Sequence, residues 1–209
     1  MQAAIVVAEK ILTIERETLG DDAEDYLGTL MQLAEMYIAL DNFEHARQAQ
    51  ATVLATQTKL HGADDWRVTD ARLALADVKF QEKLSIEDRK SLRDVEHDKL
   101  RAYQFFDSVR LAEAIEVLLR VAATEERIWG PNRRQVAATH VMLGGSYLRQ
   151  RNLAAAKLHL DKALTIQEMC LGLDHPDIAT TLTGLSGVAL AQNRFADAEP
   201  LEQRTLKIR

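Results

Sequence analysis

Apolar residues along this chain recur at spacings of three, four and seven, the pattern of α-helices that bury one face. The pattern stops at a glycine in four places, each between an apolar stretch and a polar or acidic one: Gly20, Gly62, Gly130 and Gly172. Such a glycine ends a helix, because it adopts the left-handed backbone conformation without strain. The pattern predicts ten helices, at about 2–18, 23–40, 43–60, 64–83, 86–106, 111–128, 133–150, 153–171, 175–192 and 196–208.

The four glycines are spaced almost periodically. Gly20 and Gly62 are one 42-residue period apart, and so are Gly130 and Gly172. Between Gly62 and Gly130 the spacing rises to 68, so the period breaks once. A self-similar unit of this length that holds two helices indicates a solenoid of helix pairs.

Each unit also carries a small residue where its two helices are expected to cross. An alanine lies three residues after the apolar residue that follows the second turn: Ala46, Ala114, Ala156 and Ala198. Antiparallel helices approach closely only where side chains are small, so these alanines are predicted to mark the crossings. The matching small residues on the first helices are Ala34, Gly144 and Ser186.

These residues resemble the tetratricopeptide repeat, in which Leu-small-x-x-Tyr (Leu33, Ala34 and Tyr37) precedes a turn and an alanine. The 42-residue period and the Leu-Gly-x-x-His-Pro-Asp link at 171–177 resemble the kinesin-light-chain-like subclass, which is widespread in large bacterial proteins. The resemblance implies an all-α fold, a single right-handed superhelical solenoid of antiparallel helix pairs over 1–209. Regular repeats are expected over 1–62 and 111–209, with an irregular segment over 63–110, where Asp88 takes the place of a small crossing residue.

Composition and charge exclude several classes of protein. Of the 209 residues 47% are hydrophobic and 28% charged, with only 3 prolines, which suits a folded helical protein. The net charge of −6 lies entirely in 1–62, and without a basic face a nucleic-acid partner is not expected. No apolar run approaches the roughly 20 residues that span a bilayer, so no membrane partner is expected either. The single cysteine, Cys170, excludes an internal disulfide and favours the cytoplasm.

The sequence contains no recognisable set of catalytic or ligand-binding residues. The six histidines show no i,i+4 pair typical of a helical zinc site, and Cys170 lies in an apolar stretch. Gly144 and Gly145 lie within a predicted helix, not in a phosphate-binding loop after a strand. We therefore predict no catalytic residue, no metal, no cofactor and no enzymatic activity.

The resemblance also implies a binding site, because first helices of such arrays line a concave groove that holds a partner's peptide or helix. Peptide-clamping relatives often carry two asparagines where this chain has Met31-Gln32, Val141-Met142 and Thr183-Gly184, so only Gln32 keeps an amide. This departure favours a more apolar groove, suited to an amphipathic helix or to a neighbouring segment of the protein itself. Carried over one at a time, the groove residues are Gly28, Met31, Gln32, Glu35, Ile38, Ala138, Val141, Gly145, Leu148, Arg149, Thr180, Thr183, Gly187 and Leu190.

The function expected from these features is a protein-interaction scaffold or adaptor, alone or as the repeat region of a larger bacterial signalling protein. The alternative is a structural solenoid that self-associates by stacking through uncapped terminal helices. Residues 2–18 match a second helix without its first helix, and 196–208 ends without a cap. The identity of the partner does not follow from the sequence.

Overall fold

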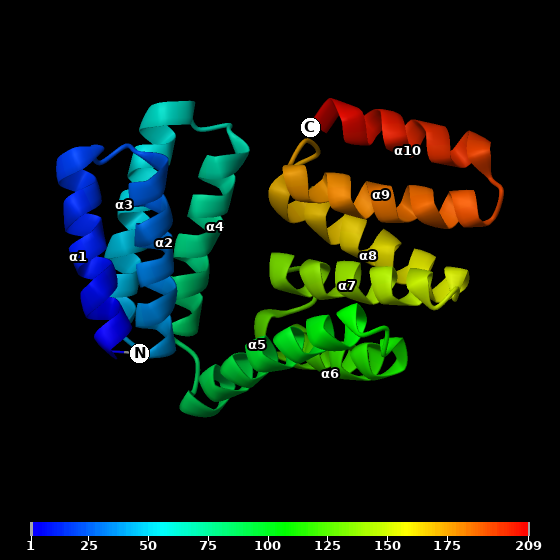
Figure 1. Ribbon diagram of the computed structural model, residues 1–209, viewed down its shortest axis with the longest axis horizontal. Coiled ribbons are helices and arrows are strands. Elements are labelled where there is room, and N and C mark those ends of the chain that lie inside the picture. The colour runs from blue at the N-terminus through cyan, green and yellow to red at the C-terminus, as the bar shows by residue number, and fades with distance from the viewer. Residues whose placement is uncertain (1, 209) are drawn as a thin grey trace. The chain divides into compact units, whose positions relative to one another are not determined.

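The computed structural model describes residues 2–208, and this part of the chain consists of ten α-helices without any strand (Figure 1). Every predicted helix is present, with ends within two residues of those expected, which confirms the all-α prediction. The helices are α1 (Gln2–Thr18), α2 (Glu24–Ala39), α3 (Phe43–His61), α4 (Trp66–Gln81), α5 (Ile86–Asp107), α6 (Leu111–Trp129), α7 (Arg134–Arg149), α8 (Leu153–Leu171), α9 (Pro176–Ala191) and α10 (Phe195–Ile208).

The helices pack into two compact units, unit 1 over 1–85 and unit 2 over 86–209. In unit 1, α2 packs against α1 and α3, and α4 packs against α3. In unit 2 each helix from α5 to α10 packs against the next, and α7 also contacts α9. The expectation of a single solenoid over 1–209 concerns how the two units are joined, and it stays a prediction.

Within each pair, the first helix and the second helix pack together where the predicted small residues lie. On the second helices, α3, α6, α8 and α10, the crossing alanines are at most 3% exposed. On the first helices, Ala34 and Ser186 are fully buried, and Gly144 leaves no room for a side chain. A Cβ atom on Gly144 would lie 2.5 Å from Cγ of Leu160. The predicted crossings are therefore confirmed, and the close approach explains why α7 carries a glycine there.

The longer spacing between Gly62 and Gly130 arises because two first helices follow one another. Ala76 of α4 comes one 42-residue period after Ala34, and Ala102 of α5 comes one such period before Gly144. The stretch from Ala76 to Ala102 is too short for a second helix and its turns, which accounts for the break in the period. Accordingly α4 packs on α3 and α5 packs on α6. The segment 63–110 thus holds the last helix of unit 1 and the first helix of unit 2.

The turns inside the pairs share one backbone geometry. A residue with φ between 57° and 65° precedes each second helix from α3 onwards: Asp41, Val109, Arg151 and Asn193. In two of these turns the next residue caps the helix, since Asn42 Oδ1 accepts from His45 N–H and Asn152 Oδ1 from Ala155 N–H. The left-handed conformation costs little for asparagine and most for a β-branched residue.

Replacement of Val109 by asparagine is therefore expected to stabilise unit 2. The side chain of Val109 is 64% exposed, so little packing is lost, while the strain of about 1 kcal/mol is relieved. Asn193 already occupies the equivalent turn, with φ 59°. Urea unfolding should show a higher midpoint for Val109→Asn. Val109→Ile, which keeps the β-branch, should leave the midpoint unchanged, and an equal gain in both variants would contradict the strain argument.

Candidate functional site

The predicted groove residues of α2 lie on a surface of unit 1. Met31, Gln32 and Glu35 are exposed, and Ile38 is half-buried against the cluster formed by Phe43, Ala46 and Val78. Gly28 is half-buried on the same helix. The remaining predicted residues belong to unit 2, so the structure divides the predicted site between two separately packed units.

In unit 2 the predicted residues lie on two helices that contact each other directly. The side chain of Leu148 on α7 covers Gly187 on α9, where an added Cβ would lie 3.2 Å from Leu148 Cδ2. No atom lies within 4 Å of a Cβ built on Gly145, so the surface is open there. Val141 is half-buried like Leu148, while the remaining predicted residues are exposed: Ala138, Arg149, Thr180, Thr183 and Leu190.

Helix α5 contributes residues to this surface that the sequence pattern did not predict. Counting back one period from Gly145 and Leu148 leads to Tyr103, which is 54% exposed, and to Phe106. Nη1 of Arg149 donates to the carbonyl oxygen of Phe106 at 3.0 Å, and its guanidinium lies 4.2 Å from the Phe106 ring centroid. These contacts join the carboxyl ends of α5 and α7. The signal in the sequence was Ala102, one period before Gly144, which identifies α5 as a first helix.

We call this surface the first-helix face of unit 2. Its middle is apolar and is open at Gly145, and the nearby guanidinium of Arg149 is held by Phe106. The open space at Gly145 leaves room for the backbone of an approaching helix, and the aromatic and aliphatic side chains offer contact area around it. The face comprises Tyr103, Phe106, Val141, Gly145, Leu148, Gly187 and Leu190.

A buried carboxylate links the first three helices of unit 2. Glu125 of α6 is 1% exposed, and its Oε1 lies 2.7 Å from Nζ of Lys99 on α5. Thr139 of α7 donates its hydroxyl to Glu125 Oε2 at 2.6 Å. Burial raises the pKa of Glu125, against the lowering effect of the Lys99 charge. One repeat later, the Thr181 hydroxyl donates to Gln167 Oε1 at the same 2.6 Å. A neutral amide there accepts the threonine hydrogen bond that the Glu125 carboxylate accepts here.

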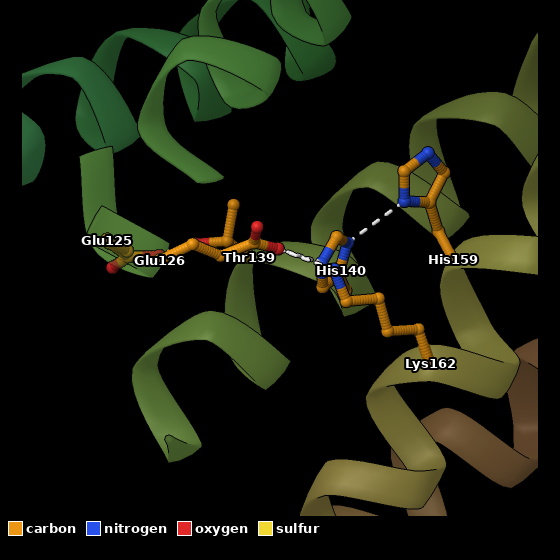
Figure 2. A network of polar contacts seen from close by, with 6 residues as sticks. All are labelled: Glu125, Glu126, Thr139, His140, His159 and Lys162. Carbon is orange, nitrogen blue, oxygen red and sulfur yellow. Dashed lines mark hydrogen bonds and ion pairs between the residues drawn. The ribbon is translucent and has the colours of Figure 1, made fainter. Parts of the chain in front are cut away.

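Next to this carboxylate, two histidines face each other at the core of the α7–α8 pair (Figure 2). Nδ1 of His140, a residue only 4% exposed, lies 2.9 Å from Nδ1 of His159, and its Nε2 lies 3.4 Å from Glu126 Oε1. Lys162 donates to the same carboxylate oxygen at 2.5 Å. Burial and, after it, the Lys162 charge lower the pKa of His140 to about 4, and the same two causes lower that of His159.

The hydrogen-bond partners of the two neutral histidines determine which nitrogen of each ring carries the hydrogen. A carboxylate only accepts, so His140 Nε2 carries a hydrogen toward Glu126. His140 Nδ1 is then an acceptor, and His159 donates its Nδ1–H to it. The His159 ring also stacks on Tyr147, with centroids 5.4 Å apart and planes at 7°. Both ring nitrogens of the buried His140 are therefore occupied by other parts of the chain, which favours a structural role.

Three further features bear on candidate sites in the part of the chain that the structure describes. Residues 2–208 contain no group of three His, Cys, Asp or Glu side chains placed to hold a metal ion. His175, in the predicted link between repeats, lies at the start of α9, where its Nδ1 accepts from the Asp177 backbone N–H at 3.2 Å. None of the ten helices is both long and apolar enough to cross a membrane, among the residues described.

Comparison with known proteins identifies the repeats. Two family models, each described as Tetratricopeptide repeat, match residues 27–67 and 135–209. The first match covers most of α2 and all of α3, and the second covers α7 to α10. The chain is a tetratricopeptide-repeat protein. The second helices of both matched regions carry the crossing alanines on which the resemblance rested.

Two solved structures show what this tetratricopeptide-repeat protein is similar to. The crystal structure of BtubC (BKLC) from P. vanneervenii matches 99% of this chain and 90% of its own, with 17% identity and a TM-score of 0.52. A Podosopora anserina protein, described as a candidate kinesin light chain with nearly identical TPR-like repeats, matches 99% and 85%, with 19% identity and a TM-score of 0.44. At such identities the likeness concerns the fold. The curated proteins include no significant match.

Proposed function

We propose that this tetratricopeptide-repeat protein is an interaction scaffold whose first-helix face in unit 2 binds a helix of a partner protein. Tetratricopeptide repeats generally mediate protein–protein interaction. The observation that supports this face is its open apolar surface. Tyr103 and Leu190 are exposed, and no atom lies within 4 Å of a Cβ placed on Gly145. These positions are apolar, although the fold alone would tolerate polar side chains there.

The composition of the face favours an amphipathic helix over an extended peptide. Extended peptides are held through their backbone, which needs amides or other polar groups along the groove. Val141, Gly145 and Leu148 supply none, whereas a helix can place its own apolar side chains on them at i, i+3 and i+4. The α2 surface around Met31, Gln32, Glu35 and Ile38 is proposed as the corresponding contact of unit 1. Because Cys170 is the single cysteine of the chain, the cytoplasm is the compartment that we propose.

A charge placed on the face should abolish binding. We expect Leu148→Glu to weaken the complex with a captured and then purified partner at least tenfold, because an unpaired carboxylate would be buried beneath the bound helix. The matched control is Leu158→Glu on α8, where the leucine is 68% exposed and lies outside the face. Titration calorimetry with both variants checks this, after circular dichroism has shown unchanged helix content. Equal affinity of the wild type and Leu148→Glu would refute the assignment.

A further inference from the structure

A pocket of about 340 Å³ lies in unit 2 between α8, α9 and α10, and it shares no residue with the first-helix face. Its apolar lining comes from all three helices: Leu164 on α8, Leu185, Val188 and Ala189 on α9, and Pro200 and Leu201 on α10. The three α9 residues are at most 6% exposed, so they form the bottom of the pocket. Ligand pockets range from roughly 300 to 1,000 Å³, and roughly 150 Å³ already holds a benzene ring. The pocket is therefore large enough for one aromatic side chain.

The pocket lies where α9 lacks an aromatic residue that most other first helices carry. The residues three positions after the crossing residue are Tyr37 on α2, Lys79 on α4, Phe105 on α5, Tyr147 on α7 and Ala189 on α9. One repeat earlier, Tyr147 packs against the cluster that includes Ile115 and Ala122 of α6, and it stacks on His159 of α8. The corresponding lining residues of the pocket stand one 42-residue period later: Lys157, Leu164 and Leu201. Ala189 therefore leaves open the space that Tyr147 fills in the preceding repeat.

Unit 1 shows which group meets the tyrosine hydroxyl at this place. The hydroxyl of Tyr37 on α2 donates to Oε1 of Glu9 on α1 at 2.6 Å. Glu9 stands five residues after Ala4, which lies one period before the crossing residue Ala46. Asp161, which lines the pocket, likewise stands five residues after the crossing alanine of α8. The pocket thus offers a carboxylate at the position where unit 1 binds a tyrosine hydroxyl.

The charges around the mouth of the pocket are paired. Nζ of Lys157 lies 2.6 Å from Asp161 Oδ2, and Nε of Arg194 lies 2.6 Å from Asp197 Oδ2. Each pair is neutral as a whole, which favours a neutral ligand over an anion. The Asp161 carboxylate can still accept a further hydrogen bond, because each carboxylate oxygen has more than one acceptor site. These features select a neutral aromatic ring that carries one hydroxyl group.

We propose that this pocket binds the side chain of a tyrosine supplied by a partner protein. The ring would lie against Val188 and Leu201, and its hydroxyl would donate to Asp161 as that of Tyr37 donates to Glu9. Water makes few hydrogen bonds in an apolar pocket, so a ring that displaces it gains affinity. The proposal rests on the proposed role as an interaction scaffold, but it does not depend on the first-helix face.

Titration of the full chain with p-cresol, the isolated tyrosine side chain, tests the pocket directly. NMR should show shifts of the methyl groups of Val188, Ala189 and Leu201, with a dissociation constant on the order of 1 mM. Toluene, which lacks the hydroxyl, should bind about threefold to tenfold more weakly. The peptide acetyl-Gly-Tyr-Gly-amide should shift the same methyl groups, and its phosphotyrosine form should not. Shifts confined to other methyl groups, or binding of p-cresol without binding of the peptide, would overturn the proposal.

Two variants copied from other repeats separate the ring contact from the hydrogen bond. Asp161→Leu reproduces Leu119, one period earlier, and should bind toluene as before but lose the preference for p-cresol. Ala189→Tyr should fill the pocket with its own ring, abolish the p-cresol shifts and raise the midpoint of urea unfolding. The matched control Ala123→Tyr, at an exposed alanine on α6, should change neither property. Retained p-cresol binding in Ala189→Tyr would refute the site, and if that variant does not fold, the wild type and Asp161→Leu decide between the outcomes.

Discussion

Replacement of Lys99 by methionine is expected to lower the free energy of unfolding of unit 2 by about 3–5 kcal/mol at pH 7. The ammonium of Lys99 lies 2.7 Å from Glu125 Oε1, and Glu125 is 1% exposed. Methionine keeps most of the side-chain volume but leaves the carboxylate buried with only the Thr139 hydroxyl as a partner. Urea unfolding followed by the fluorescence of Trp129 on α6, in a Trp66→Phe background, measures the loss.

Two further measurements distinguish a buried charge from lost packing. Adding Glu125→Gln to Lys99→Met should restore most of the stability, because the variant then copies the neutral Gln167–Thr181 contact of the next repeat. The deficit of the single variant should also shrink as the pH falls. Burial raises the pKa of Glu125, and removing Lys99 raises it further, so the folded state takes up a proton before the unfolded state does. A deficit that persists in the double variant would mean that packing by Lys99 is what matters.

The regular part of the fold follows from the sequence because its repeats are marked by local chemistry. Glycines end α3, α6 and α8, alanines mark the helix crossings, and each of these signals depends on a few adjacent residues. Helix α5 was harder to place, since its length and charge conceal a first helix. Only Ala102, one period before Gly144, identifies α5 as the first helix of a pair. This register becomes visible once it is recognised that no second helix lies between α4 and α5.

The candidate site was predictable only in part, for a related reason. The residues on α7 and α9 follow from the repeat register, because equivalent positions on successive first helices face the same way. Tyr103 and Phe106 were not predicted, because the register of α5 was not recognised from the sequence. The buried contacts of Glu125 and His140 depend on partners 14 to 26 residues away on other helices, and no local pattern predicts which side chains will meet. Division into two units is likewise a property of packing between helices.

The two neighbouring histidines should make unit 2 less stable in mild acid. The pKa of His140 is about 4 in the folded state and about 6.5 in the unfolded state, so its contribution to stability is present above pH 6.5 and is lost as the pH falls toward 4. Between pH 7 and pH 5 this loss amounts to about 2 kcal/mol, at about 1.4 kcal/mol per pKa unit. The lowered pKa of His159 acts in the same direction. Urea unfolding at the two pH values, again followed through Trp129, measures the change.

The next repeat of the chain supplies the variant that tests this attribution. Leucines occupy the equivalent positions, Leu182 for His140 and Leu201 for His159, so the double replacement by leucine reproduces a packing that the protein already uses. Because both rings are removed together, neither Nδ1 atom is left without its partner, and Glu126 keeps the hydrogen bond from Lys162. The double variant should unfold with nearly the same midpoint at pH 7 and pH 5. Glu125, with its raised pKa, opposes the histidines but is present in both proteins, so it cancels in the comparison. If the double variant lost as much stability on acidification as the wild type, protonation of this pair could not be the cause.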